Sequence, residues 1–290
     1  MRKINPTTQV PSQFLDRIGS ALRNGKNNQN RTNYYAVSST LKSLFRAYNR
    51  NLVPMNLQSL TPHTGFTEPQ IKTVHNLYES GEKEFDKLWD ELKKANGGSI
   101  LRCPICGVSF AKELDHYVPR ELFPEFSANP LNIIPLCHDC NHDKGAKWKD
   151  DTGYRLIFNA YFDELSQKKL LKCEINQILN GLPLAEVSTC TIANPDDVDK
   201  RALKTIEELN LTTYYTNYVN KDLATEVCQM QDDYSIKRGA INNSREFWAD
   251  RRNTYAVYLT NPSKYTEERI LLYEALISSP VFDTWIIANL

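Results

Sequence analysis

Apolar residues recur every three or four positions along much of this chain, a spacing that is typical of amphipathic helices. Near the start, Phe14, Ile18 and Leu22 follow this spacing and predict one apolar helix face. A longer pattern is interrupted near Gly81, where a glycine allows the helix to kink. Helices are predicted over residues 11–23, 39–51, 68–95 and 266–278 and through most of 195–260, with a polar loop at 24–33.

The middle of the chain has a different pattern, with short extended segments and few helical signals. A hairpin is expected from residues 108–110 and 113–118, and a further strand over 132–136. From Cys137 the sequence predicts a helix that continues to about Trp148. Short strands followed by one helix are therefore expected in this region.

Beyond residue 150 the apolar and polar residues alternate in two stretches. Residues 168–175 and 185–192 have the two-residue period of a strand, and together they predict a two-stranded antiparallel ribbon. Combined with the helices on both sides, these strands place the chain in the α+β class. The expected architecture is a mainly helical chain around a small mixed module.

The composition allows a packed core, because 41% of the 290 residues are hydrophobic and 10% are aromatic. No run of about 18 or more apolar residues occurs, so no membrane span is expected. The first residues, Met-Arg-Lys-Ile-Asn-Pro, lack the apolar stretch of a secretory signal. These features predict a cytoplasmic protein.

Charge is unevenly distributed, although the net charge of the chain is zero. Residues 1–50 contain nine lysines and arginines but one acid, Asp16, so this segment carries +8 and the remaining residues carry −8. A basic arm on an acidic body is typical of a segment that follows nucleic-acid phosphates. The alternative is a solvated helix face, or a surface that packs against the acidic remainder.

Four of the seven cysteines form two C-x2-C pairs, Cys103 with Cys106 and Cys137 with Cys140. Pairs with this spacing in an intracellular chain predict a zinc site rather than a disulfide framework. Four thiolates complete the tetrahedron of Zn²⁺ and leave no position for water, so the predicted metal is structural.

The residues between and after these cysteines resemble a known family. The chain reads Cys-Pro-Ile-Cys, then Leu-Asp-His-Tyr-Val-Pro-Arg, then Pro-Leu-Asn-Ile-Ile-Pro-Leu-Cys-His-Asp-Cys-Asn-His-Asp-Lys-Gly. This order resembles the HNH endonucleases, which have a ββα-metal fold. The resemblance covers about 45 residues and implies a zinc-stapled HNH module that cleaves DNA with Mg²⁺ or Mn²⁺.

The resemblance gives roles to the central residues. An imidazole titrates near neutral pH, so His116 is expected to take the proton of the attacking water. The resemblance implies that Asp115 reaches the divalent ion, although strand alternation alone would point it to the opposite face. Asn132 is expected to hold the loop and to orient the base.

Two neighbouring residues compete for the third position of the motif. The resemblance places Asn141 there, and an amide oxygen is able to bind a hard cation. His142 follows at about 100° around the helix, so both cannot easily face one ion. We favour Asn141 and keep His142 as the alternative. Lys144 and Arg120 are candidates for phosphate contacts.

Three regions are expected: a basic helical region at 1–97, the HNH module at 98–150 and a mixed ribbon and helical region at 151–290. The last region is similar in texture to HNH proteins of bacterial anti-phage systems, Septu-like ones among them, which implies an ATPase partner. DNA is the expected substrate, and a double-strand break would require an oligomer or successive nicks. The rival interpretation is a catalytically silent zinc-knuckle module that binds nucleic acid or protein.

Overall fold

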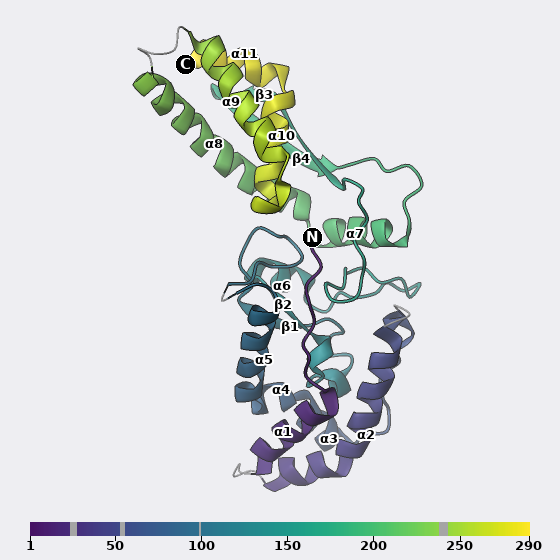
Figure 1. The fold of residues 1–290 in the computed structure, drawn as a ribbon. Helices are drawn as coiled ribbons and strands as arrows, with labels where there is room; N and C mark the ends of the chain where they lie inside the picture. Colours follow the sequence, from purple (N-terminus) through teal and green to yellow (C-terminus); the bar gives the residue numbers. More distant parts are fainter. Residues whose placement is uncertain (24–27, 53–55, 99, 238–242) are drawn as a thin grey trace. The chain divides into compact units, whose positions relative to one another are not determined.

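The computed structural model describes residues 1–290 except 24–27, 53–55, 99 and 238–242 (Figure 1). The chain divides into two compact units, Met1–Ser166 and Gln167–Leu290. The expected basic helical region and the expected cysteine-rich module both lie in the first unit. The α+β class is confirmed, because the described chain is mainly helical and contains two small antiparallel sheets.

Among the residues described before the cysteine-rich module, five helices occur. The helix expected over 39–51 begins earlier, because Tyr34 and Val37 extend the buried stripe of Leu41 and Phe45 by one more turn. Residues 28–33 of the expected loop are thus helical, and residues 24–27 lie outside the described part. The helices are α1 (Pro11–Arg23), α2 (Asn28–Leu52), α3 (Glu68–His75), α4 (Leu77–Ser80) and α5 (Glu82–Ala95), with a short 3-10 turn at Leu57–Ser59.

The predicted interruption at Gly81 is confirmed and separates α4 from α5. A side chain at this position would collide with its surroundings, since a Cβ would lie 2.9 Å from Ile18 Cγ1 and 3.0 Å from the carbonyl oxygen of Leu77. Glycine therefore allows α1 to pack closely against α4. A second break, at Asn76, separates α3 from α4 and was not expected.

The module contains two strands and one helix. β1 (Glu113–His116) pairs antiparallel with β2 (Ile133–Leu136), and α6 (His138–Lys144) follows directly. The expected hairpin between 108–110 and 113–118 is wrong, because Phe110 bridges to Arg102 instead. Short 3-10 turns at Pro124–Phe126 and Pro130–Asn132 lie in the long connection between β1 and β2.

The helix α6 is shorter than predicted and ends at Lys144. Gly145 follows with a φ of +46°, in the left-handed region that ends helices and favours glycine. Trp148, which the sequence places at the end of this helix, is buried beyond it and packs against Phe123.

The first ten residues cross the module as an extended segment before α1 (Figure 1). The backbone N–H of Arg2 donates to the carbonyl of Pro104 at 2.8 Å, and that of Ile4 donates to Ala160 at 2.9 Å. These bonds join the start of the chain to the first cysteine turn of the module and to the segment after the module. They explain why the basic N-terminal region and the module form one unit.

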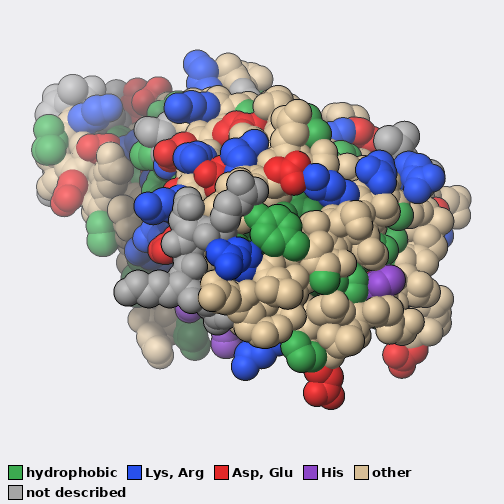
Figure 2. Space-filling view, turned by 90° about the horizontal axis from the view of Figure 1, so that it is seen from below, with side chains coloured by type: hydrophobic (Ala, Val, Ile, Leu, Met, Phe, Trp, Pro, Cys, Tyr) green, Lys and Arg blue, Asp and Glu red, His purple; other side chains and the backbone are tan. Residues whose placement is uncertain are grey.

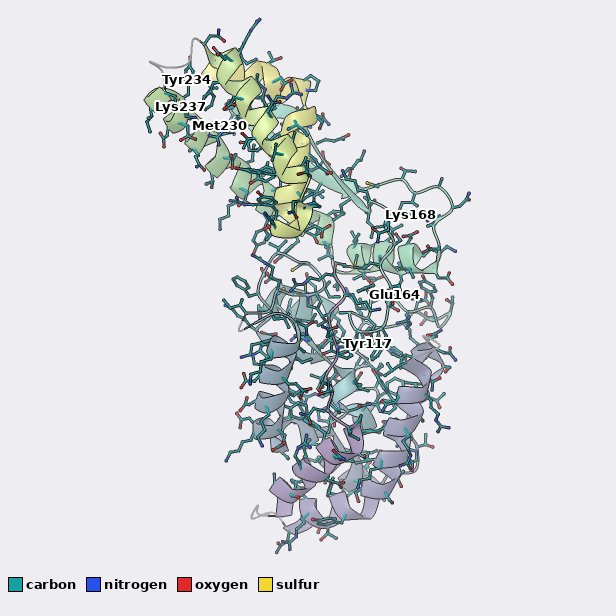
Figure 3. All side chains as sticks on the ribbon, viewed as in Figure 1. Tyr117, Glu164, Lys168, Met230, Tyr234 and Lys237 are labelled. Atoms are coloured by element: carbon teal, nitrogen blue, oxygen red, sulfur yellow. The ribbon has the colours of Figure 1, made fainter. Side chains whose placement is uncertain are left out.

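A buried polar network supports the chain directly after β1. Arg155 pairs with Asp163 at 2.7 Å and donates to the Tyr117 hydroxyl at 3.0 Å. That hydroxyl in turn donates to the carbonyl of Ile157 at 2.7 Å. The Arg155 and Asp163 side chains are 2% and 0% exposed, so each charge depends on the other for solvation. Figure 3 shows Tyr117 inside this unit and Glu164 near its surface.

The second unit packs helices on a β-ribbon. The predicted ribbon is confirmed, and its strands β3 (Leu171–Leu179) and β4 (Leu182–Thr189) meet in a tight turn at Asn180-Gly181, where both φ angles are positive. α8 (Leu211–Lys237) packs on β4 and α10 (Glu267–Ser278) packs on β3. Figure 3 marks Met230, Tyr234 and Lys237 along the last turns of α8. The helices are α7 (Asp197–Glu208), α8 (Leu211–Lys237), α9 (Ser244–Leu259), α10 (Glu267–Ser278) and α11 (Pro280–Asn289), with a 3-10 turn at Pro262–Lys264.

Among the described residues, no single helix has the length and apolar character needed to cross a membrane. The consecutive helices α10 and α11 reach that length only as a pair, and they bend by 81° between them.

Removing one charge of the buried pair should destabilise the first unit. We expect Asp163→Asn to lower the free energy of unfolding by about 3 kcal/mol, because Arg155 would keep its buried charge without a counterion. The neighbouring Glu164→Gln is the matched control, since Glu164 pairs with Lys3 at the surface and its side chain is 73% exposed. Urea unfolding should show a change of no more than about 0.5 kcal/mol for the control. Equal effects of the two substitutions would contradict this assignment.

Candidate functional site

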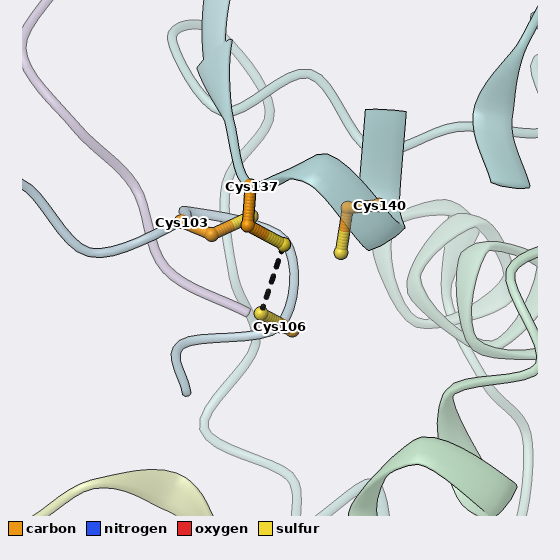
Figure 4. A group of neighbouring side chains, drawn as sticks. All are labelled: Cys103, Cys106, Cys137 and Cys140. Carbon is orange, nitrogen blue, oxygen red and sulfur yellow. Dashed lines mark hydrogen bonds between the residues drawn. The ribbon is translucent and has the colours of Figure 1, made fainter. Parts of the chain in front are cut away.

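The four cysteines of the two C-x2-C pairs meet at one point (Figure 4). All four are buried, and their Sγ atoms lie within 4.8 Å of one another. Cys106 Sγ and Cys137 Sγ are 3.8 Å apart. Zinc–sulfur bonds of about 2.3 Å place two sulfurs of a tetrahedron about 3.8 Å apart. The cluster therefore fits a structural Zn²⁺ ion.

Local backbone geometry turns the first pair toward this point. The N–H of Gly107 donates to the carbonyl of Cys103 at 2.8 Å, and Gly107 has a φ of +69°. This tight turn folds Cys106 back beside Cys103. The second pair needs no special turn, because Cys137 precedes α6 and Cys140 lies in its first turn. The four thiols act on one another: hydrogen bonds among them lower the pKa of Cys106, while those from Cys103 and Cys106 raise the pKa of Cys140.

A cavity of about 330 Å³ is lined by residues of β1 and α6 and of the segments that follow them. Four residues that the sequence selects contribute to its lining. Asp115 and His116 come from β1, Asn141 comes from α6, and Arg120 comes from the connection after β1. Asn132, His142 and Lys144 lie outside the lining. The fold thus gathers one acid, one imidazole, one amide and one guanidinium around a single space.

His116 is held in one orientation by a backbone carbonyl. Its Nε2 lies 2.9 Å from the carbonyl oxygen of Ser127, and a carbonyl only accepts, so Nε2 carries the proton. In the neutral ring, Nδ1 is then the nitrogen with the free lone pair. Burial lowers the pKa of His116 to about 4, so the ring is neutral at pH 7 and able to accept a proton.

Asp115 forms an ion pair with Lys144. Lys144 Nζ lies 2.7 Å from Asp115 Oδ2 and donates to the carbonyl of His116 at 2.7 Å. The Lys144 side chain is 1% exposed. Burial raises the pKa of Asp115, and the nearby ammonium opposes that shift. The sequence predicts that Lys144 contacts a phosphate. In the structure its ammonium is instead buried against Asp115.

The structure separates the two rival residues of the third motif. Asn141 lines the cavity, and its Nδ2 donates to Glu113 Oε2 at 2.6 Å. His142 is exposed, and its ring lies 6.3 Å from that of His138. Of the two residues, Asn141 is the one that faces the cavity.

Asn132 makes the contacts of a residue that ties down a loop. Its Oδ1 accepts from the backbone N–H of Val118 at 2.8 Å and from the Tyr48 hydroxyl at 2.9 Å. Its Nδ2 donates to the carbonyls of Val118 and Phe126. The tethered segment ends just before Ser127, whose carbonyl orients His116. The effect of Asn132 on chemistry stays a prediction.

Three further residues shape the site, and the sequence argument did not include them. Tyr78 packs its ring edge-to-face on His116, with ring centres 5.1 Å apart. Glu113 orients Asn141 and also contacts His138 at 2.9 Å. Glu121 lines the cavity and lies 3.7 Å from Arg120 Nε. Glu113 could have been found from the strand, because it shares a face with Asp115 two residues later.

A second, larger cavity of about 650 Å³ adjoins the first along α4 and α5 and shares Tyr78, Leu114 and Asn141 with it. Its lining contains four acids and one base, with three aromatic rings between them. The acids are Glu79, Glu82, Asp86 and Glu113, and the base is Lys112. This side of the site is therefore negatively charged.

The basic N-terminal region is partly neutralised within its own unit. Arg17 pairs with Glu84 at 2.7 Å, Lys42 pairs with Asp16 at 2.6 Å, and Lys3 pairs with Glu164. Arg46 and Arg50 are exposed on α2. Figure 2 shows lysines and arginines interspersed with acids on the face that it displays. Part of the predicted basic arm thus packs against the acidic remainder of the unit.

Comparisons with known proteins place the chain only loosely. No family model matches it, and no solved structure matches it. A similar curated protein is "Protein ea31" of Escherichia phage lambda, which is 32% identical over 97 residues. The match covers 31% of this chain and 31% of that protein, so the chain spans less than a third of the length of this relative.

Loss of one thiol should remove the metal. We expect Cys140→Ser to reduce bound zinc from about one ion per chain to almost none, because three thiolates bind Zn²⁺ far less tightly than four. Its thermal midpoint should fall, since the metal joins two separate turns of a small module. Elemental analysis and calorimetry would measure both effects.

Cys228→Ser is the matched control for this experiment. Cys228 is exposed on α8 and is not one of the four clustered cysteines, so zinc content and melting should match the unmodified protein. Full zinc content in Cys140→Ser would show that the cluster is not the binding site.

Proposed function

We propose that this protein is a metal-dependent endonuclease of the HNH type that hydrolyses DNA phosphodiester bonds. The observation that carries the proposal is the setting of His116. Its Nε2–H donates to the carbonyl of Ser127, and His116 lines the same cavity as Asp115 and Asn141. An oriented neutral imidazole next to two oxygen ligands is what phosphodiester hydrolysis requires.

The proposed base is His116 Nδ1. A water molecule in the cavity would donate its proton to this nitrogen as it attacks phosphorus. The Ser127 carbonyl and the edge of Tyr78 hold the ring against rotation. The low pKa of His116 keeps Nδ1 unprotonated before the reaction, and the negative charge of a bound phosphate would raise that pKa as the proton arrives.

Asp115 and Asn141 are the proposed ligands of a divalent cation. A carboxylate and an amide oxygen are hard ligands of the kind that Mg²⁺ and Mn²⁺ prefer. Such a cation, when bound, stabilises the charge that develops on the phosphate and the leaving oxygen. Glu113 keeps the amide of Asn141 turned so that its oxygen is presented.

Charge around the cavity favours one approach of the DNA backbone. The groove along α5 is acidic and would repel phosphates. Arg120 lines the cavity with its guanidinium 2.5 Å from Glu79. We propose that Arg120 exchanges part of this contact for a substrate phosphate, as a guanidinium binds phosphate well.

The rival proposal is a catalytically silent zinc-knuckle module that binds nucleic acid or protein. It accounts for the four cysteines but not for a buried Asp115 and His116 at one cavity, because a scaffold gains nothing from desolvating two ionisable groups. The anti-phage role and the ATPase partner also belong to the proposal. Gln167–Leu290 holds none of the site residues and is the proposed partner-binding unit.

Plasmid cleavage tests the base. We expect the purified protein to nick supercoiled DNA with Mg²⁺ or Mn²⁺ and His116→Ala to lose at least about a hundredfold in rate, the usual contribution of a general base. His142→Ala is the matched control, and its rate should be nearly unchanged because His142 is exposed outside the cavity. A silent binding module would show no metal-dependent nicking in any of the three proteins.

The same assay tests the third position of the motif. Asn141→Ala should reduce the rate and raise the Mn²⁺ concentration needed for half of the maximal rate, because one oxygen ligand is lost. Glu113→Gln should produce a smaller shift in the same direction, since it weakens the bond that orients Asn141. If the Mn²⁺ concentration for half of the maximal rate were unchanged in Asn141→Ala and raised in His142→Ala, His142 would be the metal ligand instead of Asn141.

A further inference from the structure

The proposed metal ligand Asp115 already has a cation beside it. Lys144 Nζ is 2.7 Å from Asp115 Oδ2, with its side chain 1% exposed. Its second bond, to the carbonyl of His116, ties the ammonium to the end of β1. Lys144 lies at the last position of α6, so helix and strand both fix it. This ammonium is therefore a permanent part of the site.

The guanidinium of Arg120 is shared between two carboxylates at the cavity. Glu121 lies 3.7 Å from Arg120 Nε, and Arg120 also contacts Glu79 at 2.5 Å. Asn141 is neutral, and the Nε2 proton of His116 is donated to the carbonyl of Ser127. The lining therefore offers a divalent ion two carboxylates, Asp115 and Glu121, each of which already has a cation beside it, together with one amide.

A divalent ion needs more negative charge than this site supplies. Mg²⁺ and Mn²⁺ are usually held by one or two carboxylates together with substrate phosphates and water. At a few ångströms, an ammonium repels a divalent cation strongly even at an effective dielectric constant of about 20. A DNA phosphate would add a negative charge and two hard oxygen ligands.

We propose that Lys144 makes the divalent metal site dependent on DNA: it positions Asp115 but cancels its charge, so that the metal binds firmly only together with a substrate phosphate. This inference rests on the proposed function. Lys144 is then a positioning residue that acts through Asp115. Without DNA the site would stay largely free of Mg²⁺, and metal and DNA would strengthen each other's binding by the same factor.

The test measures binding rather than cleavage. Full-length, zinc-loaded protein carrying His116→Ala would be used, so that DNA is bound but not cut. Mn²⁺ binding without DNA is measured by electron paramagnetic resonance of the free ion at pH 8. Adding Lys144→Met should tighten this binding at least about tenfold, because the ammonium that repels the divalent ion beside Asp115 is gone. Lys147→Met is the control of equal charge change, since Lys147 is exposed beyond α6. The Mn²⁺ that still binds to Asp115→Asn is bound at other sites and is subtracted as background.

A second measurement needs no change at Lys144 and so remains valid if Lys144→Met fails to fold. The affinity of the His116→Ala protein for a short DNA duplex is measured by fluorescence anisotropy with and without Mn²⁺. We expect Mn²⁺ to raise this affinity at least about tenfold, and Asp115→Asn should remove the effect.

Two results would overturn the inference. One is equal DNA affinity with and without Mn²⁺, and the other is Mn²⁺ binding in Lys144→Met no tighter than in Lys147→Met. If the unmodified protein still nicks plasmid with Mn²⁺, these results leave the nuclease proposal intact. Absence of both nicking and any Asp115-dependent Mn²⁺ binding would remove the two proposals together.

Discussion

The meeting of four cysteine sulfurs at one point is the constraint on which the rest of the candidate site depends. The cluster joins the turn at Cys103 and Cys106 to the start of α6. It thereby holds together the two ends of the segment that contains β1 and β2. Asn141 directly follows the last cysteine, so the cluster also fixes where its amide lies relative to Asp115 and His116. The module has buried apolar residues such as Tyr117, Ile134 and Leu136, and a metal that binds only the folded form would add to the stability that they supply.

Buried polar contacts then set the fine geometry that the cluster leaves open. Asn132 holds the connection between the strands, Ser127 orients His116, and Lys144 holds Asp115. Each of these groups has lost water and needs its partner. A set of mutually dependent contacts allows few alternative arrangements, so the side chains at the cavity are fixed before any ligand arrives. Such preorganisation is what electrostatic catalysis requires.

Predictions from the local sequence were right where the pattern within one element is enough to define that element. The helix at 11–23, the break at Gly81 and the ribbon after residue 150 follow from periodicity and glycine alone. They failed where distant contacts decide. The segment at 108–110 pairs with Arg102 rather than with β1, and the N–H of Cys103 donates to the carbonyl of Ser109 at 2.8 Å. Residues 28–33 read as a polar loop but continue α2, because their helix buries Tyr34 and Val37 against the rest of the unit.

The sequence by itself determined the donor set: four cysteines at metal-binding spacing, an Asp-His pair between them and an amide just after them. These depend on residue identity and short spacing, which the chain carries directly. Only the tertiary structure decided which atoms face the cavity. It turned Asn141 inward and left His142 in solvent, and it buried Lys144 against Asp115 instead of presenting it to phosphate. The physical reason is that the direction of a side chain on a one- or two-turn helix is set by what the helix packs against, and that surface is built from residues far away in the chain.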